Sequence, residues 1–278
     1  MSTRPPPHTL SRLRVAFGTF AALEAEAPDE ASAERGIAAA FAALATVERL
    51  MHPTRAQSDL ARLADCAPGS RVPLDPWTYE LLGLCVRLHR LSDGRFDPCL
   101  PCASGRLADL DLTEAACARA RVPIRIDLGG IAKGFAVDRA VDAMRAAGCT
   151  GGLINAGGDL AAFGARVHRI VCRTGRGSAV VHLREAALAT SEVCHRSRPP
   201  EHRGHYHGVE GTPAAPGAVT VIAANAALAD GLTKCLLLAA AAERRRLLRL
   251  FDAHEVRYQN ATPSPRSKRL KSELSSNH

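Results

Sequence analysis

The pattern of hydrophobic and polar residues from 124 to 159 predicts a strand, a helix and a second strand, with a pair of glycines after each strand. In the first strand, residues 124–128, isoleucine and leucine alternate with Arg125 and Asp127, as expected when one face of a strand lies on a core. Over residues 131–147 the apolar positions recur every three or four residues, which predicts an amphipathic helix that stops at Gly148. The second strand is predicted at residues 151–155.

The same periodicity predicts three more helices, at residues 33–51, 76–92 and 228–251. Residues 174–218 show little periodicity and are rich in glycine, proline, histidine and arginine. We therefore expect one domain at residues 14–258, preceded by a flexible arm at residues 1–13 and followed by a disordered, basic and polar tail at residues 259–278.

The net charge of +8 and the pI near 9.3 suit either a small anionic ligand or nucleic acid. Much of the excess lies in an arginine run at residues 244–246 and in the tail at residues 266–271. Three tyrosines and one tryptophan offer few rings on which bases could stack, so nucleic acid is the less favoured partner.

The cysteines and the apolar stretches indicate in which cellular compartment the protein is located. Nine cysteines are scattered, and the C-x-x-C at residues 99–102 has no second pair at zinc spacing, which favours a reducing compartment. The short apolar stretch at residues 15–23 is interrupted by Gly18 and Thr19, unlike a signal peptide, and the longest apolar run has eight residues, too few to cross a membrane. We expect a cytoplasmic protein without a membrane partner.

The two glycine pairs, at residues 129–130 and 157–158, carry the candidate chemistry. Glycines at strand ends let a phosphate approach peptide N–H groups, and Lys133 beside a helix N-terminus favours an anion there. Neither a G-x-G-x-x-G fingerprint nor a Walker A loop is present. An ordinary strand-helix-strand unit whose glycines serve tight turns remains the alternative.

The run D-L-G-G-I-A-K-G-F-A-V-D-R-A from Asp127, followed by N-A-G-G-D, resembles the signature of the FAD:protein FMN transferase family (ApbE). Further resemblances follow in the family's order: F-G-T at 17–19, S-D-L-A-R-L at 58–63, G-R-F-D-P at 94–98, A-T-S at 189–191, and V-T-V-I-A-A with A-D at 219–230. Each motif is weak alone, but the series spans residues 14–258. The resemblance implies a single α+β domain with mixed or antiparallel sheets flanked by helices.

The resemblance also implies a reaction. Members of the family move FMN from FAD onto a Ser or Thr hydroxyl of an acceptor flavoprotein, usually within a motif D-x-x-[ST]-[AG]-T, and release AMP. Positions that contact FAD in the family correspond here to Phe17, Arg95, Phe96, Asp97, Asp127, Lys133 and Thr190. Two alternatives stay open: a role for Asp127 in capping a turn only, and a place for Lys133 on a solvated helix face.

The family binds Mg²⁺ at the FAD pyrophosphate through an A-D-x-x-x-T motif and a main-chain oxygen of the first glycine turn. Asp230 and Gly130 match this pattern, whereas the threonine, Thr233, comes one position early and Lys234 takes the fourth position. Thr233 still lies on the same helix face as Asp230. A charged Lys234 cannot bind the ion, so it either swings away or replaces part of the ion's charge at the phosphates. Asp230 and Lys234 are therefore the expected catalytic pair.

Two further departures concern the flavin and the acceptor. The family has an aromatic residue that stacks on the flavin where this chain has Thr54, and its histidine-containing segment survives only in outline around His207. His207 is expected to assist proton transfer from the acceptor hydroxyl, with a solvated loop histidine as the alternative. These departures keep two other functions open: a FAD-binding relative that has lost transferase activity, and a basic nucleic-acid-binding or scaffold protein. The acceptor and the oligomeric state stay unassigned.

Overall fold

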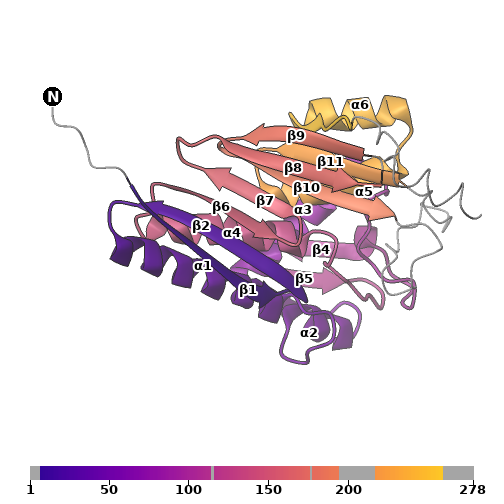
Figure 1. Ribbon diagram of the computed structural model, residues 1–278. Coiled ribbons are helices and arrows are strands. Elements are labelled where there is room, and N and C mark those ends of the chain that lie inside the picture. Colours follow the sequence, from indigo (N-terminus) through magenta and orange to yellow (C-terminus); the bar gives the residue numbers. More distant parts are fainter. Residues whose placement is uncertain (1–6, 114–115, 176, 194–216, 259–278) are drawn as a thin grey trace, which may run out of the picture.

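A seven-stranded antiparallel sheet forms the centre of the protein (Figure 1). The structure is a computed structural model and describes residues 7–113, 116–175, 177–193 and 217–258. In spatial order the strands of the sheet are β1 His8–Ala16, β2 Thr19–Ala27, β6 Gly151–Ala156, β7 Asp159–Phe163, β10 Ala186–Val193, β11 Gly217–Ala223 and β12 His254–Glu255. All neighbouring pairs run antiparallel. The predicted α+β fold with antiparallel sheets flanked by helices is confirmed.

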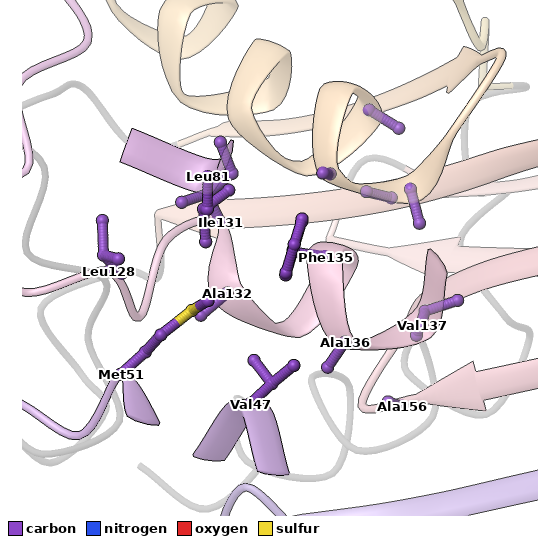
Figure 2. Packing of buried hydrophobic residues seen from close by; sticks show 14 of the residues in the cluster. Val47, Met51, Leu81, Leu128, Ile131, Ala132, Phe135, Ala136, Val137 and Ala156 are labelled. Atoms are coloured by element: carbon purple, nitrogen blue, oxygen red, sulfur yellow. The ribbon is translucent and has the colours of Figure 1, made fainter. Parts of the chain in front are cut away.

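Three helices cover one face of this sheet: α1 Glu30–Leu50, α4 Ala132–Ala146 and α5 Ala226–Leu238. On β2, every second residue from Ala21 to Ala27 is buried beneath them, because side chains alternate across a strand. Figure 2 shows Val47 and Met51 from the end of α1 beside Ala132 at the start of α4. The main core lies between these helices and the sheet.

A hairpin covers part of the other face. Its strands are β8 His168–Thr174 and β9 Gly177–Leu183 (Figure 1). Cys172, Val181 and Leu183 of the hairpin form a second, smaller buried cluster with Leu160 and Leu188 of the sheet. The central strands are therefore buried on both faces.

The remaining elements extend the helical side of the molecule. They are α2 Asp59–Asp65, α3 Pro76–Leu91, the 3-10 helix η1 Leu107–Asp109, α6 Ala241–Leu250, and a three-stranded sheet of β3 Val72–Pro73, β5 Cys117–Ala120 and β4 Leu110–Thr113. Side chains of Asp29, Ser58, Asp75 and Asn225 accept backbone N–H groups at the starts of α1, α2, α3 and α5. Among the helices described, none combines the length and the apolar character needed to span a bilayer.

Two predictions about the first half of the chain are wrong. Residues 8–13 of the predicted arm belong to β1, which pairs with β2 along its whole length. Because β1 is an edge strand with few buried side chains, it shows no hydrophobic alternation. Residues 124–128 form no strand: the predicted alternation of buried and exposed residues is present, but only Ile126 makes an isolated bridge, to Cys99. The backbone of these residues forms hydrogen bonds with an irregular loop instead. For example, the N–H of Asp127 donates to the Pro98 carbonyl.

Two further differences lie in the second half. The single helix predicted at residues 228–251 is two helices, α5 and α6, separated by extended backbone at Ala239 and Ala240. Alanine is the best helix former, so this break comes from tertiary packing and not from local preference. The weakly periodic region 174–218 contains β9 and β10. The predicted tail at residues 259–278 lies outside the described residues.

Candidate functional site

Helices α4 and α5 each receive a carboxylate at their N-terminus from the other helix. The carboxylate of Asp138 in α4 accepts N–H groups of Ala226 (2.7 Å) and Ala227 (2.8 Å) at the start of α5. In return, Asp230 of α5 accepts the N–H of Gly134 in the first turn of α4 at 3.3 Å. Both helices are stabilised because each N-terminus carries a partial positive charge. Asp230 is thereby fixed, fully buried, at the start of α4.

Two lysines and two aspartates form a cluster of four charges beside this helix N-terminus. Lys234 pairs with Asp230 one turn earlier in α5, and Lys133 pairs with Asp159 at 2.6 Å. Burial, and then the charge of Asp230, raise the pKa of Asp159, while both lysines oppose the rise. These mutual effects make Lys133, Asp159, Asp230 and Lys234 one electrostatic unit, called here the four-charge cluster.

The two glycine pairs lie beside the four-charge cluster. Lys234 runs across the first pair: a Cβ added to Gly130 would lie 3.3 Å from its Cε. The second pair, directly before Asp159, has φ angles of +63° and +99° at Gly157 and Gly158, which glycine adopts readily. One residue of each pair, Gly129 and Gly157, is exposed. An anion that reaches the four-charge cluster from solvent therefore meets peptide groups without side chains.

Of the expected magnesium ligands, the structure brings Asp230 and Gly130 together around Lys234, but it turns Thr233 away. The Thr233 hydroxyl donates to the Asp230 carbonyl at 2.6 Å and lies 2.6 Å from Ser191 Oγ on β10. The Lys234 ammonium takes the place beside the Asp230 carboxylate. A divalent ion about 4 Å from that ammonium would be repelled by about 8 kcal/mol at an effective dielectric constant of 20. In this arrangement the residues do not fit a divalent ion.

The turn that carries Arg95, Phe96 and Asp97 is tied to its own loop. Phe96 is a buried core residue. Asp97 accepts the N–H of Cys99 at 2.9 Å and that of Leu107 at 3.3 Å. The Arg95 guanidinium donates to the carbonyl of Ser92. These contacts give all three residues structural roles, and the predicted contacts with FAD remain predictions.

Asp127 and Phe17, two of the residues expected to contact FAD, both lie at turns. Asp127 is exposed and accepts the N–H of Gly129 at 2.8 Å, so it caps this turn. Phe17 lies in the tight turn between β1 and β2, with φ of +52°, and near the second glycine pair, because the Phe20 carbonyl accepts the N–H of Gly157 at 3.2 Å. The contacts with FAD that the resemblance implies for both residues stay predictions.

Thr190 and Thr54 are placed differently. The hydroxyl of Thr190 lies 2.8 Å from that of Thr220, on the opposite face of β10 from Ser191 and therefore from Thr233. Thr54 is exposed, and its N–H and hydroxyl contact Nδ1 of His52. The structure does not bring Thr190 to the four-charge cluster.

Two carboxylates of the site, Asp159 and Asp138, were not identified from the sequence. Asp159 carried a signal, because it directly follows the second glycine pair of N-A-G-G-D. No sequence motif marks Asp138, because its partners lie 88 and 89 residues away in the chain. His207 lies outside the described residues.

Comparisons with known proteins agree on the fold and the family. The model of the ApbE family matches residues 17–110 and 102–257. The flavinyl transferase ApbE of Pseudomonas stutzeri, in its apo form, is similar with a TM-score of 0.76 and 21% identity over 92% of this chain and 93% of that one. The flavin transferase ApbE of Vibrio cholerae gives 0.75 and 18% over 90% and 93%. The ApbE protein of Thermotoga maritima gives 0.74 and 24% over 89% and 93%. Comparison with curated protein sequences gave no match.

Proposed function

Because this chain belongs to the ApbE family, we propose that it transfers FMN from FAD to a Ser or Thr hydroxyl of an acceptor flavoprotein and releases AMP. Two structurally similar proteins are flavin transferases. The observation that carries the proposal is the four-charge cluster: two ammonium groups, each paired with an aspartate, at a helix N-terminus that two glycine pairs border. Such a place suits the pyrophosphate of FAD, which is anionic and needs close approach to the backbone.

The proposed reaction is a phosphoryl-group transfer. The hydroxyl oxygen of the acceptor attacks the phosphorus of the FMN half, and a new O–P bond forms. The P–O bond to the bridging oxygen breaks, AMP leaves with that oxygen, and the hydroxyl proton is released to a base. Negative charge on the leaving AMP is stabilised by nearby cations, so positioning and electrostatics supply most of the catalysis.

The chain's own residues divide these tasks. Lys133, whose side chain is 28% exposed, is the cation that a ligand can reach from solvent. Asp159 and Asp230 hold the two lysines, and Gly134 N–H holds Asp230. His207 is kept as the proposed base for the acceptor hydroxyl.

The resemblance also implies a Mg²⁺ ion at the FAD pyrophosphate. Asp230 would be its carboxylate ligand and Gly130 would supply a main-chain oxygen, as the resemblance implies. Because Lys234 pairs with Asp230 and Thr233 bonds to Ser191, these donors do not fit the ion in the arrangement described. No step proposed above passes through a metal.

Two observations bear on the partner and the location. Within the arginine run, Arg244 pairs with Glu255 and Arg246 with Glu243, which lowers its attraction for nucleic acid. We therefore keep a small anion as the ligand. The scattered cysteines of the sequence support the proposed cytoplasmic location. Thiol titration of protein purified without reductant would contradict that support if it found disulfides.

The test is a transfer assay with defined substrates. The purified protein is incubated with FAD and Mg²⁺, with and without a peptide that carries D-x-x-[ST]-[AG]-T, and AMP and peptide mass are followed. The expected result is AMP release together with a mass gain of one FMN, and no gain on a control peptide with alanine at the acceptor position. Tight FAD binding without AMP or labelled peptide would instead indicate a FAD-binding relative that has lost transfer.

A further inference from the structure

The place of Lys234 in the four-charge cluster suggests what it does. Its ammonium lies on the Asp230 carboxylate, and its methylene groups pass over Gly130. Its side chain is 10% exposed, and that of Asp230 is fully buried. Asp230 and Gly130 are the two positions that the resemblance assigns to a divalent ion, so this lysine occupies the space between them.

The charges of the cluster balance without an ion. The two aspartates contribute two negative charges and the two lysines two positive charges, all on side chains that face one another. A buried carboxylate needs a compensating charge, and Asp230 already has one from its own helix. A divalent ion at Asp230 would have to displace the Lys234 ammonium, whose methylene groups pack over Gly130.

We propose that Lys234 is a built-in cation that replaces the divalent metal, so that this chain binds the pyrophosphate of FAD without Mg²⁺. This inference rests on the proposed function for the identity of the ligand. The statement that Lys234 replaces the metal does not depend on the proposed function, because it applies to the apoprotein as well.

Three proteins decide the question: the wild type, Lys234→Thr and Lys133→Thr. Lys234→Thr restores a hydroxyl four residues after Asp230. Lys133→Thr is the matched control, because it removes an ammonium from the same cluster but leaves Lys234 on Asp230. Circular dichroism and thermal melting establish that each variant folds, and Lys234→Arg is the substitute that keeps the charge if Lys234→Thr does not fold.

The first measurement is Mn²⁺ binding to the three apoproteins, by electron paramagnetic resonance or calorimetry. We expect Lys234→Thr to bind Mn²⁺ at least tenfold more tightly than the wild type and than Lys133→Thr. If Lys234→Thr does not fold, equal and weak Mn²⁺ binding by the wild type and Lys234→Arg is the expected result. Stoichiometric Mn²⁺ binding by the wild type, lost in Asp230→Asn, would overturn the proposal, because the lysine would then give way to the ion.

The second measurement is FAD binding by fluorescence, with Mg²⁺ and with EDTA. The wild type is expected to bind FAD equally, within twofold, in both conditions, whereas Lys234→Thr is expected to lose at least tenfold in EDTA. A tenfold loss by the wild type in EDTA would overturn the proposal. If the wild type binds FAD in EDTA but labels no peptide, the proposed transfer fails while this inference stands. If the wild type binds no FAD at all, the Mn²⁺ measurement alone decides it.

Discussion

Two glycines within helices give a sharp test of how closely α4 and α5 approach. A Cβ added at Gly134 of α4 would lie 2.3 Å from the carbonyl oxygen of Ala226 and 2.9 Å from Cβ of Asp230. A Cβ added at Gly83 of α3 would find its nearest neighbour, Leu112 Cδ1, at 4.0 Å. Gly83→Ala and Gly134→Ala therefore make the same chemical change, but only the position of Gly83 has space for the added methyl group.

The expected stabilities have opposite signs. Alanine is favoured over glycine in a helix interior by about 1 kcal/mol, so Gly83→Ala should raise the free energy of unfolding by about 0.5–1 kcal/mol. Gly134→Ala, in the first turn of α4, has at most this gain. It must also push main chain aside, which costs about 1–3 kcal/mol, and it disturbs the carboxylate caps of both helices, at about 1–2 kcal/mol. We expect a net loss of about 1–4 kcal/mol.

The assay is denaturant unfolding of both variants, followed by FAD binding. For a chain of this length, 1 kcal/mol corresponds to about 2–4 °C in Tm. Gly134→Ala should also weaken FAD binding, because Asp230 and Lys234 move with α5, whereas Gly83→Ala should not. Equal stability and equal FAD binding in the two variants would refute the close approach of α4 and α5 and, with it, the placement of the four-charge cluster.

Three further predictions concern single polar groups. Burial raises the pKa of Asp138 to about 6 from 3.8, so its protonation stabilises the folded state fully below pH 3.8, and this stabilisation is lost as the pH rises through 6. Relative to Asp138→Asn, the wild type should lose about 2 kcal/mol between pH 4 and pH 7, and a difference in unfolding free energy that does not change with pH would contradict this. Lys133→Met should destabilise by about 3 kcal/mol at pH 8, because Asp159 is left buried and unpaired, and adding Asp159→Asn should recover most of the loss in thermal melts. Thr233→Val should cost about 1–2 kcal/mol through the unpaired Ser191 hydroxyl but leave FAD affinity within twofold, and a tenfold loss of affinity would restore Thr233 as a ligand.

The fold could be predicted where local pattern and burial agree. The helices expected at residues 33–51 and 76–92 are α1 and α3 with ends shifted by three residues or fewer, because each buries one stripe and begins at a capping aspartate. β1 could not be predicted, because an edge strand is stabilised by backbone pairing, which leaves no trace in side-chain periodicity.

The candidate site was predictable to the extent that its residues belong to motifs. Gly130, Lys133 and Asp230 were found in this way, and the structure places them in or beside one cluster. The exchange of carboxylates between α4 and α5 could not be predicted in this way, because it depends on which turns of the two helices meet. Asp138 and Ala226, for example, are 88 positions apart in the sequence.

The sequence left open whether Thr233 or Lys234 would face Asp230, and helix stereochemistry explains the outcome. Threonine in a helix can donate its hydroxyl to a carbonyl three or four residues back, and Thr233 does so to the Asp230 carbonyl, which turns it from the carboxylate. Side chains on a helix lean toward its N-terminus, so a long residue at i+4 reaches back to the residue at i. Both preferences act within α5 alone. The ion pair of Lys234 with Asp230 therefore forms with the helix itself, and any divalent ion has to compete with a partner that is present before FAD arrives.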